Sequence, residues 1–271
     1  MITLTLRPRP SLSAALRLPL RLAAELHARE PRLALFGALL LVLLLPMAVA
    51  AGLDDRMLRN ANVWIKPMKF SLSIAVLAFT TAWFAGHLPE RVRAGRAMDR
   101  IVWLLVLTGS FELGYITLQA GLGAGSHYNL SDAFHMAMYA LMGIAALVLT
   151  ATQPMLAWQL YRHGDRSLPS AYRQAVLLGL VLTFVMGAGA GMLLSNLQPP
   201  DGGAGLPVFG WTLQGGDLRP AHFVGIHAEQ VLPLLAFAAG ALGAVRARTV
   251  LWAGALAYAA LFGALLVWGL S

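Results

Sequence analysis

The sequence predicts an all-α integral membrane protein with seven transmembrane helices, on three observations. Hydrophobic residues make up 58% of the 271 residues and charged residues only 12%, about half of the roughly 25% that soluble domains carry. Seven segments are apolar over about 20 residues, the length that crosses a bilayer. Apolar runs such as residues 39–45 do not alternate with polar residues, as the strands of a lipid-facing β-barrel would.

The interruptions between these segments are short and rich in turn residues, so we expect a single membrane domain over residues 33–271. The predicted spans are 33–53, 66–86, 100–121, 133–160, 172–195, 219–243 and 249–270. Residues 1–32 form a basic arm in which leucines alternate with arginines. An amphipathic helix in the headgroup layer and a solvated basic tail both explain that pattern.

The first span also resembles a signal peptide, because the small residues 48–50 follow its leucine run. The region before the run is longer than signal peptides have, which favours a retained helix. Either interpretation leaves the orientation of the other spans unchanged.

Basic residues predict the orientation. The arm and every second loop carry 15 of the 20 Lys and Arg residues, and the opposite side carries 5. Since loops rich in Lys and Arg stay in the cytoplasm, we expect a cytoplasmic N-terminus and an extracytoplasmic C-terminus. The localisation predicted in this way is the bacterial cytoplasmic (inner) membrane.

Charge and cysteine content exclude several functions. Topology explains the net charge of +8, so we expect no nucleic-acid partner. The sequence has no cysteine, which excludes disulfide scaffolds, thiolate metal sites and thiol catalysis. The predicted partners are the lipid bilayer and a lipophilic or periplasmic small molecule, and the oligomeric state stays open.

Residues 196–218 form a long loop rich in glycine and proline before the sixth predicted span. A lid over an extracytoplasmic site and a plain connector both explain it. Asp217 stands where it would cap the following helix. In the fifth span, Gly187, Gly189 and Gly191 predict close helix packing.

Ionisable residues within the spans are the main functional signal, because each costs at least about 2.5 kcal/mol to insert. Glu112 lies in the third span, and His222, His227 and Glu229 lie in the sixth. Lys66, Lys69 and His135 stand at the outer ends of their spans. The predicted topology places all of these residues in the outer half of the membrane and predicts no comparable polar stripe in the inner half.

Helical spacing groups some of them. Glu112, Tyr115 and Gln119 share one stripe of the third span. His222 and His227 point about 140° apart on a regular helix, so they reach one centre only if the helix is distorted near Gly225. We expect His27, His87 and His163, which lie in the arm or in cytoplasmic loops, to be solvated.

Three chemistries are compatible with this cluster. His222, His227, His127 and His135 are candidate ligands of Zn, Fe or Cu, with Glu112 or Glu229 as the proton-transfer group. Two facing histidines, for example His135 and His222, are candidate axial ligands of haem b. The same groups would also serve as a proton relay in a transporter. The expected polar lining consists of Lys66, Lys69, Tyr115, Gln119, Asn129, Asp132, Asp217, Arg219 and Gln230.

Three stretches resemble a family of uncharacterised bacterial multi-pass membrane proteins. They are residues 64–70 (WIKPMKF), 126–129 (SHYN) and 216–230 (GDLRPAHFVGIHAEQ), of which the last is the most specific. The resemblance covers the second to the sixth span and implies the membrane fold, but the family has no activity to transfer. An acidic residue often stands at the family position of His135, which makes His135 a weaker ligand candidate than the other histidines.

The leading hypothesis is therefore a membrane-embedded enzyme or redox protein, either a metal-dependent hydrolase or a haem or metal oxidoreductase. One alternative is a small-solute or proton-coupled transporter. A second alternative is a non-catalytic assembly or sensor protein.

Overall fold

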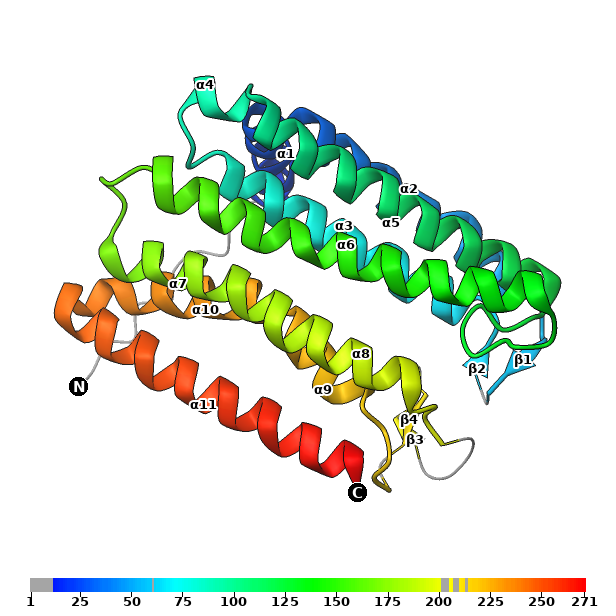
Figure 1. Ribbon diagram of the computed structural model, residues 1–271. Coiled ribbons are helices and arrows are strands. Elements are labelled where there is room, and N and C mark those ends of the chain that lie inside the picture. Colours follow the sequence, from blue (N-terminus) through cyan, green and yellow to red (C-terminus); the bar gives the residue numbers. More distant parts are fainter. Residues whose placement is uncertain (1–11, 60, 201–204, 207–209, 213) are drawn as a thin grey trace, which may run out of the picture.

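The computed structural model describes residues 12–59, 61–200, 205–206, 210–212 and 214–271. Helices account for most of these residues, so the predicted all-α fold is confirmed (Figure 1). Two small antiparallel hairpins of two-residue strands are added at the loops. They are β1 (Met57–Leu58) with β2 (Ala61–Asn62), and β3 (Gly205–Leu206) with β4 (Trp211–Thr212).

The helices follow the predicted segments closely. Those of the first half are α1 (Leu12–Arg29), α2 (Pro31–Leu53), α3 (Ile65–Ala85), α4 (Glu90–Arg93), α5 (Arg96–Leu122) and α6 (Ala133–His163). Those of the second half are α7 (Ser170–Leu182), a π-helix (Thr183–Ala188), α8 (Gly189–Asn196), α9 (Arg219–Ile226), α10 (Ala228–Ala239), a 3₁₀ turn (Gly240–Leu242) and α11 (Ala244–Leu270).

Six helical segments are long and apolar enough to cross a membrane. The fifth of them joins α7, the π-helix and α8 into one span, Ser170–Asn196. A further pair, α9 and α10, passes the same test only together and is bent by 52° at its break. Counted as one span, this pair makes seven, which agrees with the seven apolar segments of the sequence.

Burial identifies the surfaces that face lipid. Only 11% of the apolar window of α11 and 17% of that of α6 is buried, against 44% for α3, for α5 and for the fifth span. Large apolar side chains therefore cover the outside of α6 and α11, including Phe134, Ile144, Val245 and Leu256. An exposed apolar surface of this extent is typical of a membrane-embedded protein.

The spans form two groups that pack along α6 (Figure 1). In the first group α3 packs against α2 and α5, and α5 packs against α6. In the second group α10 packs against α7 and α11, while α9 packs against the π-helix. Helix α6 contacts both α7 and the π-helix and so joins the two groups.

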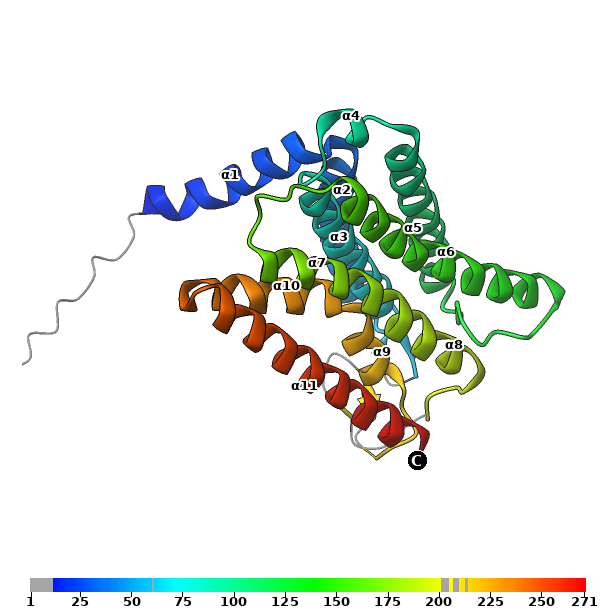
Figure 2. The ribbon, with the colours of Figure 1, turned by 60° about the vertical axis from the view of Figure 1, so that its left-hand side comes forward.

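The arm is a helix, as one of the two interpretations of its sequence predicts. Helix α1 contains Pro19 and leaves the bundle at one end of α2 (Figure 2). Glu30 caps the start of α2 and binds Arg32, whose guanidinium also contacts Asp99 of α5 at 2.6 Å. This ion network fixes the junction of arm and bundle. Residues 1–11 of the arm lie outside the described residues.

Candidate functional site

The sixth span is broken where it faces an irregular stretch of the fifth. Helix α9 ends at Ile226, α10 starts at Ala228, and the π-helix of the fifth span packs against α9. A Cβ added to Gly225 would lie 2.7 Å from the amide nitrogen of Gly187, so only glycine allows this approach. The expected distortion near Gly225 is thus present as a full break.

The predicted packing role of the fifth-span glycines holds for two of the three. A Cβ on Gly187 would meet the side chain of Ile226 at 2.8 Å, and one on Gly191 would meet the His222 ring at 3.2 Å. Gly189 has open space around it. The face of the fifth span that carries Gly187 and Gly191 is therefore the one that contacts α9.

Glu229 lies just after the break and is completely buried. Its backbone amide donates to Thr183 Oγ1 at 3.0 Å, and its Oε1 accepts from Gln230 Nε2 at 2.9 Å. Among the residues that the structure describes, its Oε2 has no hydrogen-bond partner and no cation pairs with it. A buried carboxyl group in this state has to be neutralised, by a proton or by a ligand.

Gln230 connects Glu229 to the other helix group. Its Nε2 also donates to Thr80 Oγ1 of α3 at 3.1 Å, and its Oε1 lies 3.1 Å from His227 Nδ1. Since an amide oxygen only accepts, His227 Nδ1 carries the proton of this bond. We call His222, His227, Glu229 and Gln230, with Thr80 and Thr183, the junction cluster.

His222 has its own partner in the π-helix. Its Nδ1 lies 2.9 Å from the backbone carbonyl oxygen of Gly187, so Nδ1–H donates and the Nε2 atom is left as the free nitrogen of a neutral ring. The π-helix shifts its backbone out of regular register, and His222 binds one of the carbonyls there.

The junction cluster lies near the middle of the helix bundle. Thr183, which binds Glu229, is at the midpoint of the span Ser170–Asn196. Thr80, which binds Gln230, is within two turns of the inner end of α3. Glu229 follows Arg219 by ten residues, or about 15 Å, which already reaches the middle of a hydrocarbon layer about 30 Å thick.

A second group of polar residues lies between α3, α5 and α6, toward the end of the bundle that the sequence predicts to be the outer one. On α5 the buried side chains of Glu112, Tyr115 and Gln119 each have an oxygen without a partner: Glu112 Oε1, Tyr115 Oη and Gln119 Oε1. The predicted stripe is therefore buried as one face. The charges of Glu112 and Lys66 attract one another, but no salt bridge within 4 Å joins them. We call these four residues the outer cluster.

His127 borders the outer cluster from the loop between α5 and α6. Its ring lies 6.1 Å from that of Phe70 and 6.0 Å from that of Tyr139. Burial lowers the pKa of His127 well below its ordinary value, and the positive charge of Lys66 lowers it further. His127 is therefore a neutral ring at neutral pH.

The same loop ties the two helix groups together. Tyr128 has a positive φ of 56°, which is rare for a bulky side chain. Its hydroxyl donates to the Leu194 carbonyl of α8, and that of Tyr139 donates to the Ser195 carbonyl at 2.6 Å. The positive φ of Tyr128 thus accompanies a hydrogen bond that connects the two helix groups.

Other predicted lining residues have local structural roles. Asp132 caps α6 through the His135 amide and holds His135 Nδ1 at 2.7 Å, and Asn129 accepts from the Ser131 amide in the preceding turn. Asp217 is fully buried and binds Arg219 at 2.6 Å.

Asp217 also accepts from the Arg219 amide at 3.0 Å, but the N-cap position of α9 is Leu218, which has no side-chain cap hydrogen bond. The charge of Arg219 repels that of Lys69, and the charge of Asp217 attracts it. The loop before this point, residues 196–218, lies partly outside the described residues.

The candidate metal and haem ligands each have a hydrogen-bond partner of their own. Across the residues that the structure describes, no group of three His, Asp or Glu side chains is arranged to hold a metal ion. His135 and His222, the example of an axial haem pair, are bound to Asp132 and to the Gly187 carbonyl respectively.

Buried polar groups also occur toward the opposite end of the bundle, where the sequence predicts no comparable polar stripe. Thr81 of α3, Gln153 of α6 and Gln174 of α7 each have a buried side-chain oxygen without a partner. They carry no charge, so a search for ionisable residues does not find them. Buried polar side chains therefore lie toward both ends and in the middle of the bundle.

His87 was expected to be solvated, and this prediction is wrong. Its Nε2 lies 3.3 Å from the Tyr172 hydroxyl, and the two rings are edge to face at 5.7 Å. Trp83 Nε1 donates to the same hydroxyl, and the guanidinium of Arg29 stacks over the Trp83 ring at 4.0 Å. The arm, α3 and α7 thus meet around His87.

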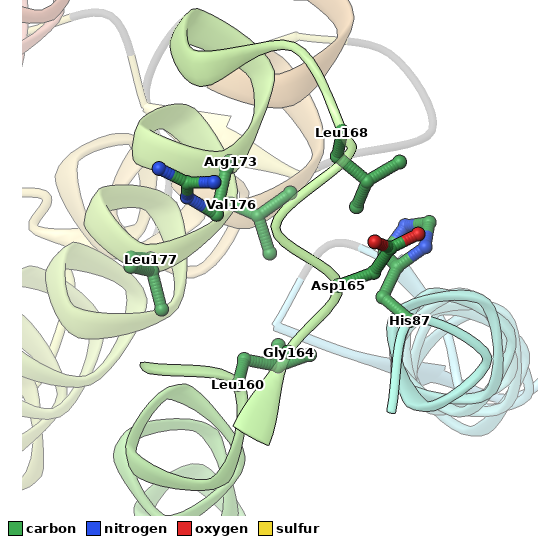
Figure 3. A pocket seen from close by; sticks show the side chains of 8 residues that line it. All are labelled: His87, Leu160, Gly164, Asp165, Leu168, Arg173, Val176 and Leu177. Atoms are coloured by element: carbon green, nitrogen blue, oxygen red, sulfur yellow. The ribbon is translucent and has the colours of Figure 1, made fainter. Parts of the chain in front are cut away.

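A shallow pocket opens beside His87, with about 260 Å³ of empty volume that includes open solvent (Figure 3). Asp165 and Arg173 supply its charged rim, and aliphatic side chains of α6 and α7 line the rest. The Asp165 amide donates to the His87 carbonyl at 2.9 Å. This bond fastens the loop between α6 and α7 to the end of α3.

The chain matches no protein-family model, no curated protein and no solved structure. Its function has to be inferred from the clusters described above.

The buried state of His87 predicts a pH effect on stability. Burial, aided by the charge of Arg29, lowers the pKa of His87 from 6.5 to about 4. Below pH 6.5 the unfolded chain binds a proton at His87, whereas the folded chain binds one only below about pH 4. The stability that the neutral ring contributes is therefore complete above pH 6.5 and is lost as the pH falls toward 4. Since the ring is partly exposed, we expect a loss of ~1 kcal/mol.

Thermal unfolding of the detergent-purified protein at pH 7 and pH 5 measures this loss. The variant His87→Gln should lose less stability on acidification than the wild type. His163→Gln, which alters an exposed ring, should behave as the wild type. An equal pH dependence in all three proteins would contradict this role of His87.

Proposed function

We propose that this protein is a proton-coupled transporter of a small solute, with Glu229 as the proton-binding group. The observation that carries the proposal is the fully buried Glu229 at the break of a bent span, with one carboxyl oxygen unpartnered and no cation beside it. Ionisable groups at such depth are rare and mark proton or solute pathways.

The surrounding geometry supports the same conclusion. Transporters place coupling sites near the bilayer midplane, at discontinuous helices whose backbone lines the site. Here a bent span lies against a π-helix at mid-depth, and Gln230 links Glu229 to Thr80 in the opposite helix group. A change in the protonation of Glu229 would act directly on the hydrogen bonds between the two groups.

Polar groups at several depths give a proton or solute intermediate partners on both sides of Glu229. The outer cluster lies on one side, and the buried oxygens of Thr81, Gln153 and Gln174 lie on the other. This distribution favours transport over the leading hypothesis from the sequence. A metal or haem enzyme needs converging ligands, whereas the described histidines have separate partners.

We also propose that the N-terminus is cytoplasmic and that the membrane is the cytoplasmic membrane of a bacterium. The support is the excess of arginine on the arm and on alternate loops. In this orientation the outer cluster faces the extracytoplasmic side and the His87 pocket faces the cytoplasm.

Single cysteine variants test the orientation, because the chain has no cysteine of its own. Ser131→Cys and Ser167→Cys replace exposed serines in the two loops that flank α6. In intact cells a membrane-impermeant maleimide should label Ser131→Cys, and should label Ser167→Cys only after the cells are opened. The reverse pattern would contradict the proposed orientation.

Proton movement in liposomes tests the function. Purified protein is reconstituted in vesicles that contain a pH-sensitive dye, and a potassium gradient with valinomycin sets an inside-negative potential. We expect acidification of the lumen to be at least tenfold faster with the wild type than with Glu229→Gln, because the amide carries no exchangeable acid proton. Glu25→Gln, on the exposed face of α1, is the matched control and should resemble the wild type.

Equal rates for the wild type and Glu229→Gln would contradict the proposal. The melting temperature of each variant in detergent shows that the comparison is made between folded proteins.

A further inference from the structure

The outer cluster holds a lysine and a glutamate that lie within electrostatic range of one another without touching. Lys66 extends from the first turn of α3 and Glu112 from the middle of α5. Each charge acts on the other, yet they form no salt bridge within 4 Å. Among the described residues, Lys66 has no hydrogen-bond or salt-bridge partner, and its ammonium lies 6.0 Å from the ring of Phe70.

Lys66 also lies in the field of further cations. The charges of Lys69, Arg59 and Arg219 repel it, and Glu112 is the one carboxyl group among the charges that act on it. Like charges are costly to hold together away from bulk water. A carboxylate next to Lys66 would relieve this repulsion.

Glu112 lies among hydrogen-bonding groups that also lack partners. Glu112 and Gln119 are each only 2% exposed, and Tyr115 is 6% exposed. Glu112 Oε1 is a buried acceptor without a donor. Gln119 Oε1 and the Tyr115 hydroxyl lack a partner of hydrogen-bond geometry, although these two side chains interact with one another. An unsatisfied buried carboxyl oxygen is costly, so this helix face points to a bound molecule that donates hydrogen bonds.

The remaining wall is apolar. Phe70, Phe111, Met138 and Met142 pack around Tyr115 and Ile116. A ligand that fits here has a negative group for Lys66, a positive hydrogen-bond donor for Glu112 and an apolar part.

We propose that the outer cluster binds the zwitterion of a small apolar amino acid. Its carboxylate pairs with Lys66, its ammonium donates to Glu112 and Gln119, and its side chain lies against Phe70, Phe111 and Met142. Since the ligand brings one charge of each sign, it completes both halves of the Lys66–Glu112 pair. The inference names the solute of the transporter proposed above and depends on that proposal only for what happens after binding.

The test measures binding of L-leucine to the detergent-purified, full-length protein by isothermal titration calorimetry. Two half-ligands are the matched probes: 4-methylpentanoate, which lacks the ammonium, and 3-methylbutylamine, which lacks the carboxylate. We expect L-leucine to bind at least tenfold more tightly than either half-ligand. Lys66→Met should abolish the binding of L-leucine, and Glu112→Gln should weaken it at least tenfold.

No detectable binding of L-leucine to the wild type would overturn the inference. So would equal binding of 4-methylpentanoate, which would reveal a simple anion site. If Lys66→Met does not fold, Glu112→Gln and the half-ligands still decide the question. Calorimetry in detergent measures amino-acid recognition without a membrane potential, so a failure of proton movement in liposomes is distinguished from a failure of recognition.

Discussion

A carboxyl group buried in the middle of a membrane domain has to be neutralised, and the arrangement of the sixth span follows from how this is done. No cation reaches Glu229, and its one side-chain hydrogen bond comes from the neutral amide of Gln230. A proton on the free oxygen removes the charge at the lowest cost. The break at His227, the π-helix opposite it and the glycine contact between them bring polar backbone and side-chain groups to this depth.

The same contacts make Glu229 part of the mechanical connection between the helix groups. Gln230 bonds to Thr80 on one side and to Glu229 on the other, while His227 orients it. At the outer end Tyr128 and Tyr139 bind the end of α8, and at the inner end Trp83 and Tyr172 connect α3 to α7. Release of a proton would change the central connection, and rocking of one group against the other around this site would then open the end contacts in turn.

Much of the fold could be predicted from the sequence because lipid leaves the backbone few options. Composition and segment length predicted the helices, and Gly225 indicated where the sixth span is distorted.

The sites were harder to predict. Spacing placed Glu112, Tyr115 and Gln119 on one buried face, but it could not show that His222 binds a carbonyl of the π-helix, because a π-helix has no marked sequence pattern. The sequence did not single out the uncharged polar residues of the bundle interior, because only ionisable residues are conspicuous within apolar spans. These residues are Thr80, Thr81, Gln153 and Gln174. The prediction that His87 is solvated was wrong because its partners, Tyr172 and Arg29, are distant in the sequence and come together with His87 only in the fold.

The most direct test of the central claim is the protonation of Glu229 itself. Infrared difference spectroscopy of the reconstituted protein, recorded as the external pH is stepped from acidic to alkaline, detects the C=O stretch of a protonated carboxyl group. If Glu229 carries the proton, the wild type shows a pH-dependent band of this kind that is absent from Glu229→Gln and kept in Glu112→Gln. An identical set of bands in the wild type and in Glu229→Gln would contradict the claim.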